Sequence, residues 1–257
     1  MGEGQRSQGQ RLAQVSRETS GGDDLVPTAR STAIMTTPAL AIHQPEAADA
    51  RSLADQAYYR IRELIVTLEL PPGSLVSERE LMEQLGLGRT PVREALRTLA
   101  RERLVVVYPR RGMFVSPVDV GDLAGLSEVR VTLEGRAARL AAERATDTER
   151  ATTDALLAEL DGVSAQDERS LIDLDQRLHR HVYRCAHNPF LEATLNEYYM
   201  LTLRIWFLVL DRVVRLEDAI QEHRELLEAI RDRDPARAED VMRRHVEGFE
   251  KAVRRVL

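Results

Sequence analysis

Apolar residues recur at helical spacing from about residue 51 onward, and the first two helices can be bounded from this pattern. Residues 53–68 carry an apolar side chain at every third or fourth position, which predicts an amphipathic helix. The run at 71–73, Pro-Pro-Gly, predicts a turn after it. Ser77, with Glu80 three residues later, is a capping-box pattern and predicts the start of a short second helix, SERELMEQLG.

A third helix and a hairpin follow. After a tight turn at 85–88, the segment RTPVREALRTLARERL places apolar residues on one face and arginines on the other, which predicts a helix. The next run, VVVYPRRGMFV, has two β-favouring stretches around a basic turn and predicts a hairpin with a cationic tip. Three helices followed by a basic hairpin, in this order, indicate a winged helix-turn-helix.

The rest of the chain is predicted to be entirely helical. Neither a glycine-rich phosphate loop nor an alternation of strands and helices occurs in it, which argues against a nucleotide-binding α/β domain. Thr146 with Glu149 forms a second capping-box pattern, and Pro189 and Pro235 suit first helical turns. The fold class is therefore mainly α, with an N-terminal winged helix-turn-helix and an all-α helical-bundle effector domain. The predicted helices of the bundle are 121–145, 146–162, 167–186, 189 to a break near Asp211, 217–231 and 235–254.

Charge divides the chain in the same way. Residues 51–117 hold 11 basic and 8 acidic side chains, although the whole chain has a net charge of -6. A basic segment between acidic ones is typical of a small nucleic-acid module joined to a second domain. Residues 1–50 lack an apolar period and are predicted to be a disordered extension. The predicted domains are thus 51–117, for DNA binding, and 118–257, for effector binding and dimerisation.

Cysteine and hydropathy restrict the cellular setting. The chain has one cysteine, Cys185, which excludes a disulfide framework. The longest purely apolar run, 205–210, is far shorter than the roughly 20 residues that span a membrane. We therefore expect a cytoplasmic protein without membrane contact.

The start of the third helix carries the side chains that DNA recognition needs. In a helix-turn-helix the N-terminal end of this helix enters the major groove, where arginine reads guanine or binds phosphate. Glycine at a wing tip permits close approach to the minor groove. Thr90 is expected to cap the helix and to contact phosphate or a thymine methyl. The predicted DNA-binding residues are Arg79, Arg89, Thr90, Arg93, Arg110, Arg111 and Gly112.

These residues carry a family resemblance. The segment SERELMEQLGLGRTPVREALRTLARERLVVVYPRRGMFV closely resembles the DNA-binding domain of GntR-type bacterial transcription regulators, over residues 53–117. The core R-T-P-V-R-E-A-L is highly specific. Gly88 departs from the family pattern, in which serine or threonine often precedes the arginine. The resemblance implies binding of double-stranded operator DNA, without the phosphate contact of that hydroxyl.

A second constellation lies in the helical region. Five of the six histidines fall between residues 179 and 245. Asp175 and His179 are four residues apart and share a helix face, whereas His223 and His245 lie on two later predicted helices. Three imidazoles and one carboxylate would form a divalent metal site with open positions. The alternative is a polar core of structural histidines, and His181 and His187 are expected to have such a role.

The helical region also resembles a known domain. The segments LIDLDQRLHRHVYRCAHNPFL, EHRELLEAIRDRD and VMRRHVEGFEKAV resemble the FCD effector domain of the FadR-like branch of GntR regulators, over about residues 119–254. The resemblance implies that Asp175, His179, His223 and His245 bind a metal such as zinc or nickel, zinc being the first choice. It also implies a small carboxylate effector over the ion. The candidate effector contacts are Arg130, for which a surface position is the alternative, and the weaker Asn196 and Arg204.

The resemblance therefore implies a homodimeric transcription regulator, in this family usually a repressor, controlled by a small carboxylate at a metal site. A metal sensor, in which the ion itself is the signal, is the nearest alternative. A metal-dependent enzyme is a further one, but no additional general base stands at a recognisable spacing, and the DNA module would then have no purpose.

Overall fold

The structure is a computed structural model that describes residues 52–119, 121–162, 168–209 and 216–256. The segment 1–50, predicted to be disordered, and the break predicted near Asp211 lie outside the described residues.

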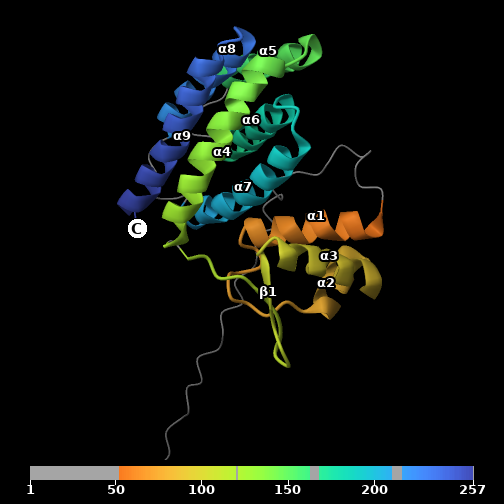
Figure 1. The fold of residues 1–257 in the computed structure, drawn as a ribbon. Coiled ribbons are helices and arrows are strands. Elements are labelled where there is room, and N and C mark those ends of the chain that lie inside the picture. The colour runs from red at the N-terminus through yellow and green to blue at the C-terminus, as the bar shows by residue number, and fades with distance from the viewer. Residues whose placement is uncertain (1–51, 120, 163–167, 210–215, 257) are drawn as a thin grey trace, which may run out of the picture. The chain divides into compact units, whose positions relative to one another are not determined.

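The N-terminal module is a winged helix-turn-helix, as predicted (Figure 1). It consists of α1 (Leu53–Val66), α2 (Glu78–Leu85), α3 (Arg89–Arg101), β1 (Val105–Tyr108) and β2 (Gly112–Val115). The two strands are antiparallel, with Val105 opposite Val115 and Tyr108 opposite Gly112. Its core lies between α1 and α3, whose apolar faces are fully buried at Ile61, Ile65, Leu96 and Leu99.

Capping fixes where these helices begin. Ser52 and Asp55 form a complete capping box at the start of α1. Ser77 Oγ accepts a hydrogen bond from the Glu80 backbone N–H at 3.3 Å, which is one half of the box predicted for α2. At α3 the N-cap is Gly88, without a side-chain hydrogen bond, so the expectation that Thr90 caps this helix is wrong. Thr90 already lies within the first helical turn, two positions after the N-cap and so too late for that contact.

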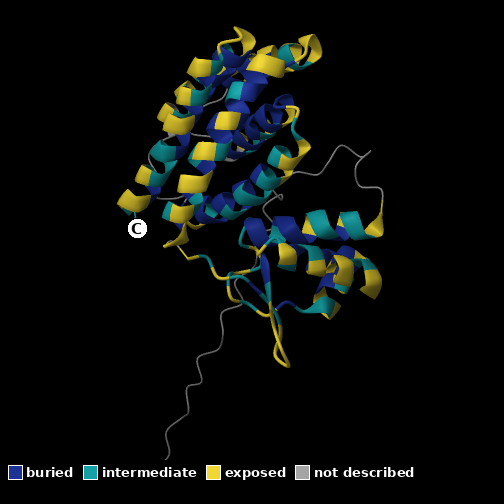
Figure 2. Cartoon of the chain, in the orientation of Figure 1, coloured by how far each residue is buried: buried dark blue, intermediate teal, exposed yellow. Residues whose placement is uncertain are grey.

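The remaining elements form an all-α bundle. They are α4 (Asp122–Arg144), α5 (Asp147–Gly162), α6 (Glu168–Cys185), α7 (Pro189–Val209), α8 (Leu216–Arg231) and α9 (Pro235–Val256). Helices α4 and α9 lie side by side and antiparallel (Figure 1). Gly135 makes this close approach possible, because a Cβ atom there would lie only 2.8 Å from Arg243 Cγ. The residues coloured as buried lie on the inner faces of the bundle helices, and the exposed residues lie on their outer faces (Figure 2).

Local signals at the helix ends of the bundle act as predicted. The Thr146 backbone N–H donates to Glu149 Oε2 at 2.8 Å, and the Glu149 N–H donates to Thr146 Oγ1 at 3.3 Å, which completes the capping box of α5. Pro189 and Pro235 are the first residues of α7 and α9. Among the described helices, none combines the length and the apolar character that a bilayer-crossing segment requires.

Candidate metal centre and DNA-binding surface

Four side chains from three helices meet inside the bundle. Asp175 and His179 come from α6, His223 from α8 and His245 from α9, and all four are buried. One potential ligand atom of each lies within 4.8 Å of all the others. His223 Nε2 is 3.0 Å from Asp175 Oδ1, and His179 Nε2 is 3.6 Å from the same oxygen and 3.3 Å from His245 Nε2. The three Nε2 atoms and one carboxylate oxygen thus converge on one point.

The outward-facing atoms of three of these residues are held by neighbours. Glu134 Oε2, from α4, is 3.0 Å from His179 Nδ1, and Glu222 Oε2 is 2.9 Å from His245 Nδ1. At His245 the Glu222 carboxylate favours the tautomer with the proton on Nδ1, which leaves the lone pair of Nε2 directed at the centre. The Tyr183 hydroxyl also lies 3.2 Å from His179 Nδ1. The Tyr199 hydroxyl donates a hydrogen bond to Asp175 Oδ2, so Oδ1 remains for the centre.

The charge states also suit a metal. Burial by itself raises the pKa of Asp175, but the neighbouring His179 and His223 outweigh it and hold this pKa well below its usual range. Burial lowers the pKa of His245 to about 4, so its imidazole is neutral at neutral pH. An ionised carboxylate and neutral imidazoles form the ligand set that zinc, nickel and similar ions accept. The residues present therefore fit a divalent transition-metal ion.

A buried ion pair lies beside the cluster. Arg130 Nε donates to Glu134 Oε1 at 2.5 Å, and the side chains of the two residues are 4% and 0% exposed. Burial raises the pKa of Glu134, but Arg130 and His179 outweigh it and lower this pKa to about 2. Arg130 lines the same cavity as Asp175, His179 and His245. Its placement inside the bundle excludes the alternative of a surface arginine.

The other two candidate effector residues lie elsewhere, which corrects the expectation drawn from the sequence. Asn196 lines a separate pocket that also contains Tyr58 and Arg180. Arg204 is 2% exposed, and its Nη2 donates to the Ser116 backbone carbonyl at 2.6 Å. Both residues belong to α7, but they face away from the cavity that Arg130 lines, so neither is positioned to contact a molecule there.

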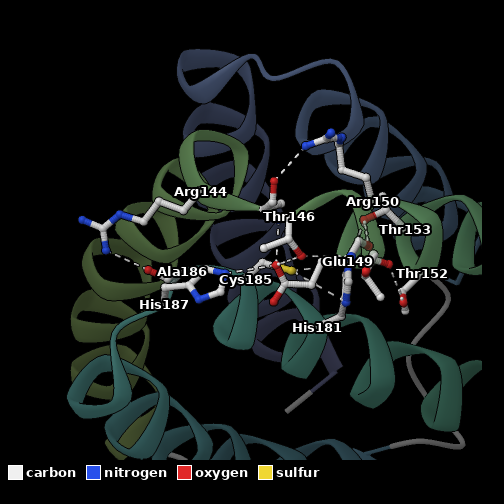
Figure 3. Close-up of polar contacts among 12 residues, drawn as sticks. Arg144, Thr146, Glu149, Arg150, Thr152, Thr153, His181, Cys185, Ala186 and His187 are labelled. Carbon is white, nitrogen blue, oxygen red and sulfur yellow. Dashed lines mark hydrogen bonds and ion pairs between the residues drawn. The ribbon is translucent and has the colours of Figure 1, made fainter.

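His181 and His187, predicted to lie outside the metal site, form a different polar group (Figure 3). Thr153 Oγ1 lies 3.1 Å from the Glu149 carbonyl and 2.8 Å from His181 Nε2. Because the threonine proton is donated to the carbonyl, Oγ1 accepts from His181. His187 Nε2 is 3.0 Å from Glu149 Oε2 at the surface. These contacts use both histidines to join α5 to the end of α6.

The predicted DNA-binding residues are all exposed on the winged module. Arg89, Thr90 and Arg93 project from the first turns of α3. Arg93 Nε donates to Glu78 Oε2 at 2.8 Å, which ties α3 to α2, yet its side chain remains 52% exposed. Arg79, on α2, lies 3.7 Å from Glu83 in an exposed pair. Arg110, Arg111 and Gly112 form the wing tip, where Arg110 and Gly112 have φ values of 64° and 105°.

Three residues that contact the four-residue cluster were not identified from the sequence, namely Glu134, Glu222 and Tyr199. Glu134 was detectable as a carboxylate four residues after Arg130 on an otherwise alanine-rich helix face. Glu222 stands directly before His223 in the sequence, but it contacts His245 on the next helix. Tyr199 has no comparable signal, because its partner Asp175 lies on another helix.

Comparison with known families agrees with both modules. Residues 53–115 match the family model "Bacterial regulatory proteins, gntR family", and residues 125–248 match the FCD domain. An HTH-type transcriptional regulator of Streptomyces ambofaciens is 33% identical over 190 residues, which are 74% of this chain and 80% of that protein. The galactonate operon transcriptional repressor of Escherichia coli is 30% identical, over 72% of this chain and 90% of the repressor.

Solved structures share the fold. Escherichia coli McbR/YncC superposes with a TM-score of 0.69 at 22% identity, covering 79% of this chain and 98% of that one. A GntR regulator from Rhodococcus sp. RHA1 gives a TM-score of 0.63 at 19% identity, over 79% and 98% of the two chains. Since members of this family are transcription regulators, the enzyme alternative is excluded. The chain belongs to the GntR family, in the FadR-like group with an FCD domain, and is a DNA-binding transcriptional regulator.

Proposed function

We propose that this regulator binds a divalent metal ion at Asp175, His179, His223 and His245, and that a small carboxylate effector bound beside the ion controls its affinity for operator DNA. The observation that carries the proposal is the convergence of three Nε2 atoms and one carboxylate oxygen in a buried cluster. The Nδ1 atoms of His179 and His245 face carboxylates, and their Nε2 atoms face each other across the point that an ion would occupy.

The metal would be held by these four side chains, and its chemistry would be that of a Lewis acid with free positions for a carboxylate oxygen. Arg130 adds a second anion-binding element. Its Nε is committed to Glu134, but a guanidinium has further N–H groups that can form a bidentate contact with a carboxylate. Two cationic groups at the same end of the cavity, the ion and Arg130, favour an anionic effector over a neutral one.

We propose that the exposed basic residues of the winged module bind DNA. We assign α3, with Arg89, Thr90 and Arg93, to the major groove and the wing tip, with Arg110 and Arg111, to the minor groove. One such module has a small footprint, so tight specific binding requires a homodimer on two half-sites. The effector regulates only if it binds better to one of the two arrangements of the DNA modules. Repression is the mode that we propose.

Elemental analysis tests the metal directly. Protein purified without chelator should hold about one zinc or similar ion per chain. His223→Ala should reduce this content strongly and blunt the response to the effector, whereas operator affinity without effector should stay nearly unchanged. His187→Ala is the matched control, because His187 is an exposed histidine outside the cluster. A metal-free wild-type chain that still responds to a carboxylate would contradict the proposal.

Operator binding separates the two modes of control. Fluorescence anisotropy on operator DNA is measured with metal alone, with a panel of carboxylates alone, and with both. We expect a change in affinity only when metal and carboxylate are present together. A full response to the metal alone would instead identify a metal sensor and contradict the role of the carboxylate.

A further inference from the structure

The cavity beside the metal cluster has a charged end and an apolar end. The volume that the centre of a water-sized molecule can occupy in it is about 40 Å³, and it opens to solvent. Arg130 and the cluster residues Asp175, His179 and His245 form the charged end. The remaining lining is mainly apolar and comes from α7 and α9, chiefly Leu203, Trp206, Val246 and Phe249.

The charged end and the apolar end of the cavity are formed by successive turns of the same two helices, α7 and α9. On α7, Tyr199 lies beside His179, with 5.0 Å between ring centroids, and Trp206 lies seven residues later. On α9, His245 belongs to the cluster and Phe249 lies one turn further. The rings of Trp206 and Phe249 meet at 5.8 Å. At 1.5 Å per helical residue, the aromatic end is therefore about 10 Å or less from the charged end.

Apart from Trp206 Nε1, the side-chain polar atoms of Tyr199 and Thr202 in this lining already form hydrogen bonds within the protein. The Tyr199 hydroxyl donates to Asp175, and Thr202 Oγ1 donates to the Tyr198 carbonyl at 3.1 Å. Trp206 Nε1 is buried without a hydrogen-bond partner among the described residues, so one donor remains. A ligand with several hydroxyl groups would bury most of them here unpaired. Each unpaired hydroxyl lowers affinity by about tenfold or more.

We propose that the effector is a carboxylate with an apolar body, an aromatic ring or a branched hydrocarbon, and not a polyhydroxylated acid. The carboxylate binds at the end formed by Arg130 and the metal, and the apolar body packs against the Trp206–Phe249 pair. Dispersion and the removal of apolar surface from water stabilise the body, and one acceptor on it can satisfy Trp206 Nε1. This inference rests on the proposed function, which requires only that some carboxylate binds at the metal.

Trp206 supplies the assay, because it is the one tryptophan of the chain. Its fluorescence is followed while the metal-loaded, full-length protein is titrated with phenylacetate, 4-methylpentanoate, acetate, gluconate and galactonate. Phenylacetamide controls for the need for a charge. We expect phenylacetate and 4-methylpentanoate to bind at least about tenfold tighter than the two sugar acids, and phenylacetamide to bind weakly. The same ligands are then tested for release of operator DNA.

The outcomes separate this inference from the proposed function. Sugar acids that bind as tightly as phenylacetate, or tighter, would overturn the apolar class while leaving a carboxylate at the metal in place. If no acid of either kind changes Trp206 emission or operator affinity, the proposed function fails and this inference fails with it. Binding of phenylacetamide as tight as that of phenylacetate would overturn the role of the carboxylate alone.

A pair of variants tests the apolar end. Phe249→Ala should weaken phenylacetate binding about tenfold and leave acetate binding unchanged, because acetate does not reach this residue. Phe190→Ala is the matched control, since Phe190 also lies on a bundle helix but is 85% exposed. Equal loss for both acids in a folded Phe249→Ala protein would overturn the placement of the apolar body. The titration of the wild-type chain decides the ligand class even if Phe249→Ala does not fold.

Discussion

Replacement of Glu134 by alanine tests the buried support of the metal cluster. Glu134 is 0% exposed and contacts two partners, Arg130 Nε at 2.5 Å and His179 Nδ1 at 3.0 Å. The substitution leaves a guanidinium in the bundle interior without its carboxylate, and it removes the group that orients the His179 ring. Two consequences follow, one for the stability of the bundle and one for its affinity for metal.

Glu134→Ala should change both the free energy of unfolding and the affinity for metal. Loss of one partner of a buried ion pair lowers the free energy of unfolding by about 3–5 kcal/mol, because the remaining charge stays desolvated. Loss of a carboxylate that holds a ligating histidine lowers metal affinity by about 10–100-fold. Glu143→Ala is the matched control. Glu143 lies on the same helix, also four residues after an arginine, but this pair is 38% and 36% exposed, so we expect a loss below about 1 kcal/mol.

Urea unfolding of chelator-treated protein measures the first effect, and competition with a zinc indicator measures the second. The double variant Arg130→Met, Glu134→Leu should regain most of the lost stability, because no unpaired charge remains, but it should not regain metal affinity. The reasoning is refuted if Glu134→Ala unfolds at the same urea concentration as Glu143→Ala and binds zinc as tightly as the wild type.

Further predictions concern DNA and pH. Arg93→Ala should weaken operator binding by about 1–3 kcal/mol without unfolding the protein, and an unchanged anisotropy titration would remove α3 from the interface. Arg111→Ala should lower affinity for all sequences alike and reduce the slope of log K against log salt by about 1, whereas a change in sequence preference would contradict a phosphate contact. Burial lowers the pKa of His181 to about 4, from an ordinary value of 6.5, so the unfolded chain takes up this proton first. Stability should therefore be full above the ordinary pKa and fall as acid is added, by up to about 1.4 kcal/mol per pH unit until the folded pKa is reached. In chelator-treated protein His181→Gln should show a shallower decline by urea unfolding, and equal slopes would contradict this prediction.

Local signals in the sequence determined where several helices begin and which residues share a helix face. Proline, glycine and capping residues act within one or two turns, which is why Pro189, Pro235 and the Thr146–Glu149 box mark helix starts correctly. The four-residue spacing of Asp175 and His179 fixes their common face without reference to any other helix. At α3 the predicted cap was wrong by two residues, because Gly88 and not Thr90 is the N-cap. A shift of one or two residues at a helix start is enough to remove a capping contact.

Only the tertiary structure decided which helix faces meet. Periodicity assigns each side chain a direction around its own helix, but the rotation of one helix against another follows from the packing of the whole core. Arg204 and Asn196 therefore do not line the cavity that contains Arg130. On α7, Arg204 points toward Ser116, and Asn196 lines the pocket with Tyr58. The same packing brought Glu134 of α4 to His179 of α6, a contact that no spacing in the sequence indicates. Residue types and spacing in the sequence indicated the four residues proposed to bind the metal. The carboxylates next to two of these histidines, and the apolar lining of the cavity, come from several helices and are brought there only by the packing of the bundle.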